Sequence, residues 1–308
     1  MLISNDDQLR TYLPNTLTTV EGEQSLYDKM ALYLRKAEAW LTRNFVGEVL
    51  MDTIAALVET DPLRILCCHI VATDAFRRTI PSLDLILTPN GFGIVSNQNV
   101  VPASADRVKR LIDSLLSNRD DLASDLLLTL ARRPDWLETE QASYFGASLW
   151  PCLDLGPLAG YNSDKWARYQ SLRLEVLNIE QELAENFISE ELMARLRRNM
   201  LTQQVTAEER TIIDSVRQTT LEMLAGKPLD YKRMFSTVQR IRTRPAIFPE
   251  WQDSYTSMLF GRPSFENHKV ICINDPVTIY IASNETIVFD YFYSLCIYGE
   301  KQNPLRFV

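Results

Sequence analysis

The sequence predicts a mainly α-helical protein with two tandem helical bundles, a β-hairpin insertion in the first bundle and a small β-rich C-terminal segment. Three observations support this fold class: apolar residues recur with helical spacing, the same pattern occurs twice, and β-branched runs are confined to two short regions. The chain has 308 residues, of which 46% are hydrophobic, and this is enough for a sizeable core. We expect repeat 1 at residues 1–150, a linker at 151–162 and repeat 2 at 163–308.

An internal duplication is the basis for predicting two bundles. Residues 44–51 (NFVGEVLM) and 186–193 (NFISEELM) share five of eight residues at an offset of 142. Two further pairs of blocks follow in the same order: 108–115 with 231–238, and 134–136 with 249–251. Chance similarity between amphipathic helices would account for a single pair. Three ordered pairs, with a Trp matched to a Trp in the last one, favour duplication.

The individual helices follow from apolar periodicity and from capping residues. In repeat 1 we expect helices near 23–45, 47–58, 62–79, 105–117 and 120–132. In repeat 2 we expect helices near 164–187, 189–202, 207–225 and 229–243. Asp61 followed by Pro62 is typical of a helix start, and Thr206 with Glu209 has the spacing of a capping box.

Two regions have β character. The first is an insertion in repeat 1 at about 81–104, in which two short apolar runs flank Asn90-Gly91, a pair that favours a hairpin turn. Repeat 2 makes the corresponding connection with only a few residues near Gly226. The second region, at about 268–298, contains β-branched and aromatic runs separated by turn residues. Its last part, 286–298, is compatible with either strand or helix.

The predicted hairpin is a candidate assembly arm. An isolated two-stranded ribbon is only marginally stable in water, so a projecting hairpin with apolar residues favours docking on another protein. A loop folded back on its own domain is the alternative interpretation. The candidate contact residues are Leu87, Pro89, Asn90, Gly91, Phe92, Ile94 and Val95.

A basic segment between Lys227 and Arg244 is the second candidate contact region. It contains six basic residues and one acid, in a chain whose formal net charge is −8. A solvated helix face is the simpler interpretation; the functional one is contact with an acidic partner, a neighbouring subunit or a nucleic-acid backbone. The candidate residues are Lys232, Arg233, Arg240, Arg242 and Arg244.

We expect no catalytic, metal-binding or cofactor-binding residues. The sequence contains two histidines, too few for a His-rich metal cluster, and no Gly-rich phosphate-binding loop. Cys67, Cys68 and His69 are interpreted as packing residues of one helix. The start of the chain lacks the features of a signal peptide, and no apolar run is long enough for a membrane-spanning helix.

Three segments resemble an uncharacterised family of phage and prophage proteins from Bacteroidetes: 2–5 (LISN), 37–40 (AEAW) and 84–104 (DLILTPNGFGIVSNQNVVPAS). The stretch 88–104 is the most specific of them. Members of this family are similar to head–tail connectors of tailed phages, also called adaptors, which are helical proteins that form a ring at the portal exit. The resemblance therefore implies a connector, with two helical units in tandem where the usual connector has one.

The resemblance also implies the partners of the chain. These are further copies of itself in a ring, the portal protein and a downstream neck or tail protein, with passive passage of DNA and no membrane. It implies synthesis in the cytoplasm of the bacterial host, a final place in the neck of the virion, no enzymatic activity and no cofactor. Two alternatives stay open: another phage neck or tail-completion component, and an enzyme or regulator that acts on nucleic acid.

Overall fold

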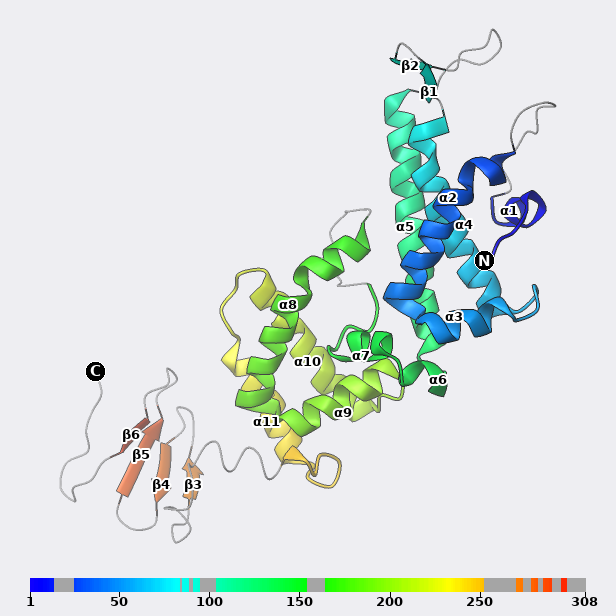
Figure 1. The fold of residues 1–308 in the computed structure, drawn as a ribbon. Helices are drawn as coiled ribbons and strands as arrows, with labels where there is room; N and C mark the ends of the chain where they lie inside the picture. The colour runs from blue at the N-terminus through cyan, green and yellow to red at the C-terminus, as the bar shows by residue number, and fades with distance from the viewer. Residues whose placement is uncertain are drawn as a thin grey trace. The chain divides into compact units, whose positions relative to one another are not determined.

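The computed structural model describes residues 1–13, 25–83, 85–88, 91–94, 104–153, 164–251 and four short strands between 270 and 297. The chain forms two compact units, Met1–Trp251 and Gln252–Val308. The first unit is built mainly from helices (Figure 1), so the predicted helical fold class is confirmed.

Repeat 1 contains α1 (Asp6–Tyr12), α2 (Leu26–Leu41), the π-helical turn η1 (Thr42–Val46), α3 (Glu48–Ala55), α4 (Pro62–Leu83), α5 (Ala105–Leu130), α6 (Pro134–Leu137) and α7 (Glu140–Gly146). Repeat 2 contains α8 (Lys165–Leu183), the π-helical turn η3 (Ala184–Ile188), α9 (Glu190–Leu201), α10 (Ala207–Leu224) and α11 (Tyr231–Arg242). The predicted capping box is present at the start of α10, where Thr206 and Glu209 each accept a hydrogen bond from the other's backbone N–H.

One helix prediction is wrong. The segments 105–117 and 120–132 form a single helix, α5, which is 26 residues long, whereas α11 has 12 residues. The residues around the expected break include neither Gly nor Pro, and Arg119 and Asp120 are buried there with their charges paired. Repeat 1 is longer than repeat 2 in this region because α5 is longer than α11, and not because of an added loop.

The two repeats share local geometry that supports their duplication. Gly47 (φ 88°) and Ser189 (φ 78°) both follow a π-helical turn in a left-handed conformation. In repeat 1 the Trp136 indole N–H donates to the Phe45 carbonyl oxygen at 2.8 Å. In repeat 2 the Trp251 indole N–H donates to the Phe187 carbonyl oxygen at 3.0 Å.

A second shared contact lies at the start of each repeat. The Glu38 carboxylate on α2 accepts the backbone N–H of Leu2 at 2.9 Å. Glu180, which stands 142 positions later on α8, accepts the backbone N–H of Leu149 at 2.9 Å. In both cases a carboxylate on the first long helix of a repeat therefore holds a chain segment that precedes that helix.

The helices of both repeats belong to one compact unit, Met1–Trp251, whereas the sequence predicted a boundary between two domains at 151–162. Trp166 at the start of α8 lies 4.9 Å from Phe45 between ring centroids, so an aromatic residue of repeat 2 completes the core of repeat 1. The backbone N–H of Trp166 also donates to the Asp120 carboxylate on α5 at 3.0 Å. Residues 154–162 of the expected linker lie outside the described residues.

The strands form two antiparallel sheets. In the first compact unit β1 (Leu85–Thr88) pairs with β2 (Gly91–Ile94), with Leu85 opposite Ile94 and Leu87 opposite Phe92. In the second unit four strands pair in sequence order: β3 (Val270–Ile273), β4 (Thr278–Ile281), β5 (Glu285–Phe289) and β6 (Leu295–Ile297). The segment 286–298, for which strand and helix were both open, thus contributes to β5 and β6.

Candidate assembly interface

The hairpin lies where α4 and α5 meet. β1 begins two residues after the end of α4, and both strands lie at the tip of the α4–α5 pair (Figure 1). Because strand residues alternate between faces, the observed register puts positions 85, 87, 92 and 94 on one face of the hairpin. Of the candidate contact residues, Leu87, Gly91, Phe92 and Ile94 belong to these strands, and Pro89, Asn90 and Val95 lie outside the described residues.

The helix ends below the hairpin are poorly covered. On α5 the first buried residue is Leu116, so the described segment 105–115 contains no buried side chain. Leu83 at the end of α4 is 39% exposed and Leu111 on α5 is 44% exposed. We call the end of α4 from 79 to 83 and the start of α5 from 105 to 115 the stalk. The stalk therefore carries apolar residues that are partly exposed, Leu83 and Leu111 among them.

The basic residues of α11 divide into two groups. Lys232, Arg240 and Arg242 are exposed on α11, and Arg244 is exposed just after it. Arg233 is half-buried and engaged within the chain, because its guanidinium lies 2.7 Å from the Glu222 carboxylate and 3.3 Å from that of Asp230. The hydrogen bonds from Arg233 lower the pKa of Glu222 to about 2. Arg233 is thus part of the α10–α11 packing, and the other four cations are the surface candidates.

The neighbouring arginines of α9 are also engaged. Arg195 lies 2.9 Å from the Glu250 carboxylate, and Arg197 lies 2.9 Å from that of Glu180. Glu180 is fully buried, and this burial raises the pKa of its carboxyl despite the nearby Arg197. These two basic side chains therefore stabilise repeat 2 rather than form a free basic surface.

Sequence reasoning missed a buried ionic cluster between α4, α5 and α8. Arg119 lies 3.2 Å from the Asp74 carboxylate and 2.6 Å from that of Asp120, and its guanidinium stacks 4.5 Å from the centre of the Trp40 ring. Burial raises the pKa of Asp120. Burial would raise the pKa of Asp74 as well, but the positive charges of Arg119 and two other arginines lower it overall. The cluster joins the helices of both repeats through Asp120 and Trp166.

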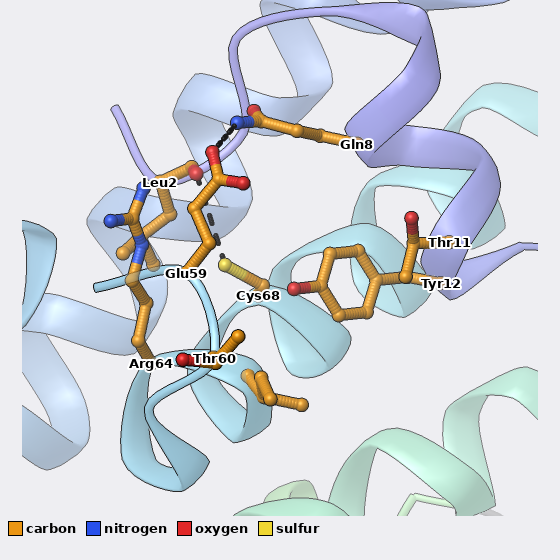
Figure 2. Close-up of a pocket in the computed structure, with 9 residues that line it drawn as sticks. Leu2, Gln8, Thr11, Tyr12, Glu59, Thr60, Arg64 and Cys68 are labelled. Atoms are coloured by element: carbon orange, nitrogen blue, oxygen red, sulfur yellow. Dashed lines mark hydrogen bonds between the residues drawn. The ribbon is translucent and has the colours of Figure 1, made fainter. Parts of the chain in front are cut away.

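A pocket of about 350 Å³ separates α1 from the beginning of α4 (Figure 2). Its polar groups are used by the fold: Gln8 donates to Glu59 at 2.6 Å, and Arg64 donates to the Leu57 carbonyl oxygen. Figure 2 shows the Tyr12 hydroxyl pointing toward Cys68, whose thiol contacts the Leu2 carbonyl oxygen at 3.8 Å. The arrangement docks α1 on α4.

The cysteine and histidine residues of α4 occupy packing positions. Cys67 is fully buried and Cys68 is 3% exposed. Burial raises the pKa of both thiols, so they stay protonated near neutral pH and are poor nucleophiles. Burial also lowers the pKa of His69. Within the described residues, no three His, Cys, Asp or Glu side chains are arranged to hold a metal ion, and none of the described helices could cross a membrane.

A further surface that the sequence reasoning did not single out belongs to α3. Glu48, Val49 and Asp52 are exposed on this helix, and Val49 has 85% of its surface accessible. The only sequence signal is charge: residues 47–63 contain four acids and no basic residue. A hollow of about 820 Å³ next to α3 is lined by residues of α2, α3 and α7.

Comparison with known proteins gives one match. Residues 13–146 match the model of a family described as a family of unknown function, DUF6712. The match lies within repeat 1, includes β1 and β2, and ends at Gly146, the last residue of α7. No curated protein and no solved structure matches the chain.

Proposed function

We propose that this chain is a structural virion protein, a head–tail connector that assembles as a ring on the portal exit of a tailed phage or prophage. The observation that carries the proposal is the hairpin insertion at the end of the α4–α5 stalk. It lies in the segment 84–104, which resembles the phage family and includes the most specific stretch of that resemblance, 88–104. Repeat 2 joins α10 to α11 through residues 225–230, so the helical fold does not require an insertion at this point.

The chemistry of the insertion favours a role in assembly. Two four-residue strands alone cannot form a stable sheet in water, and the residues on one face of this hairpin are all apolar. Among the described residues β1 and β2 pair only with each other, so the outer edge of the hairpin offers backbone groups for strand addition on another protein. Docking on the portal or on a neighbouring subunit would remove the apolar face from water and pair that edge.

The test measures association with the portal protein of the same phage. The purified chain and the portal are mixed, and rings on the portal exit are sought by electron cryomicroscopy and quantified by co-sedimentation. In an arm variant, a short Gly-Ser linker replaces residues 87–95. We expect this variant to keep the melting temperature of the wild type but to lose portal association. Leu174→Ser, at a position of α8 that is 70% exposed, is the matched control and should bind normally.

The outcomes separate the alternatives. If the wild-type chain does not bind the portal, the connector function is refuted, and binding to a later neck protein instead would indicate a tail-completion component. If the wild type binds and the arm variant binds equally well, the function stands but the hairpin has no part in it.

A further inference from the structure

Two surfaces of the chain have complementary properties, and the first is the outer face of α3. Glu48, Val49 and Asp52 lie one turn or less apart on this helix and are all exposed. Val58, just after α3, is 69% exposed. Among the described residues, no ion pair joins Glu48 or Asp52 to a cation of the same chain. The α3 face therefore combines negative charge with the exposed Val49.

The hollow beside α3 makes this face concave. It has a volume of about 820 Å³, and its wall includes Glu48 and Val49 from α3 and Glu140 from α7. Arg35 and Arg43, from α2 and η1, line it as well. A hollow of this kind can receive a long or aromatic side chain of a partner, and such anchors supply most of the binding energy at protein interfaces.

The second surface is the outer face of α11. Lys232, Phe235 and Arg242 lie on one exposed side of the helix, while Met234, Val238 and Ile241 are buried in repeat 2. Phe235 packs edge-on against Phe187 yet keeps 39% of its surface exposed. Within α11 and the two residues that follow it there is no acidic residue. The α11 face therefore combines positive charge with an exposed aromatic ring.

We propose that the α11 face of one copy binds the α3 face of a second copy. This inference rests on the proposed ring and names the surfaces that join its subunits. Cations of α11 would pair with Glu48 and Asp52, and Phe235 would cover Val49. The two faces belong to different repeats of one chain, so each copy offers one surface of each kind and successive copies can be joined head to tail.

A second copy explains the α11 face better than nucleic acid does. Phosphate contacts require cations, and the exposed part of Phe235 would gain nothing from a phosphate backbone. The α3 face supplies both features that α11 needs, carboxylates and apolar surface, within the same chain. The charge complementarity also gives the contact a direction, because two α11 faces or two α3 faces repel each other.

The test is a charge exchange measured by sedimentation velocity at low salt. The variants Lys232→Glu/Arg242→Glu and Glu48→Lys/Asp52→Lys should each weaken self-association by about tenfold or more, since like charges then meet. The chain that carries all four substitutions should regain self-association to within about threefold of the wild type, because the attraction is restored with its signs exchanged. Arg10→Glu/Arg210→Glu changes the net charge by the same amount on two other helices and should leave self-association unchanged.

Cross-linking provides an independent measurement. A chain with Val49→Cys is mixed with a chain with Phe235→Cys, and a short bis-maleimide should link the mixed pair but neither variant alone. A wild-type chain that stays monomeric, or a four-substitution chain that does not recover self-association, would overturn the inference. Portal binding is scored separately, so these results differ from a failure of the connector function.

Discussion

The equivalence of the two repeats makes a quantitative prediction about Phe45 and Phe187, which stand 142 positions apart. Phe45 is fully buried, and its ring lies 4.9 Å from Trp166, 5.1 Å from Trp40 and 5.5 Å from Phe145 between centroids. Phe187 is 6% exposed, and among the described residues its ring lies 6.3 Å from Tyr231 and 6.2 Å from Phe235 between centroids. The two side chains thus have the same role but different packing.

Truncation of each ring to Ala should reflect that difference. A buried Phe→Ala change costs about 3–5 kcal/mol, because transfer energy is lost and a cavity remains. Contacts with other rings add about 0.5–1.5 kcal/mol per pair beyond burial. We therefore expect Phe45→Ala to lower the free energy of unfolding by about 5 kcal/mol and Phe187→Ala by about 3 kcal/mol.

Urea unfolding followed by tryptophan fluorescence measures both losses. The control is Leu174→Ala, at a position 70% exposed, which should change the unfolding free energy by less than about 0.5 kcal/mol. A loss below about 1 kcal/mol for Phe45→Ala would show that the aromatic centre between the repeats is not packed as described. A larger loss for Phe187→Ala than for Phe45→Ala would refute the argument from ring contacts.

Three further predictions concern buried polar groups. Arg119→Leu leaves Asp74 and Asp120 without their shared cation and should cost about 3–5 kcal/mol in urea unfolding, whereas Arg119→Leu combined with Asp74→Asn and Asp120→Asn should recover part of that loss. Trp136→Phe and Trp251→Phe each remove an indole donor from a buried carbonyl oxygen, so each should cost about 1–3 kcal/mol, and unequal effects would argue against equivalent repeats. Burial raises the pKa of Glu180, so its protonation stabilises the fold as the pH falls through that raised pKa. Between neutral pH and pH 4.5 the melting temperature of Glu180→Gln should lack this gain, while the exposed control Glu182→Gln should follow the wild type.

Much of the helical architecture could be predicted because it depends on local patterns. The capping box at Thr206 and Glu209 involves residues three positions apart, and the Phe45 and Phe187 blocks recur almost unchanged. The continuous α5 could not be predicted in the same way. Ser117 and Asn118 are weak helix formers, and the residues that hold the helix together there, Arg119 and Asp120, are paired with groups on other helices.

The candidate surfaces show the same limit. Arg233 belongs to a cluster of basic residues in the sequence, but its partner Glu222 lies on a different helix, so the pairing depends on how α10 packs on α11. The α3 face was missed because α3 is short. A helix of eight residues has too few positions for its apolar pattern to show which of its apolar residues are buried, and only the packed structure shows Val49 exposed.

Repeat 1 has two features that repeat 2 lacks, the hairpin and the longer α5, and they have different roles. The hairpin lies between the end of α4 and the start of α5, where residues 105–115 include no buried side chain. The added length of α5 runs inward instead, and it carries Asp120 to the backbone N–H of Trp166, the residue that closes the aromatic centre. Among its described residues repeat 2 has neither feature: α11 has 12 residues, and Lys232, Arg240 and Arg242 on it are exposed. If the two repeats were identical, each chain would present the same binding surface twice. A repeat could then bind the other repeat of its own chain as well as a repeat of the next chain. Because only repeat 1 carries these additions, the chain has two different ends, which is the property that head-to-tail assembly requires.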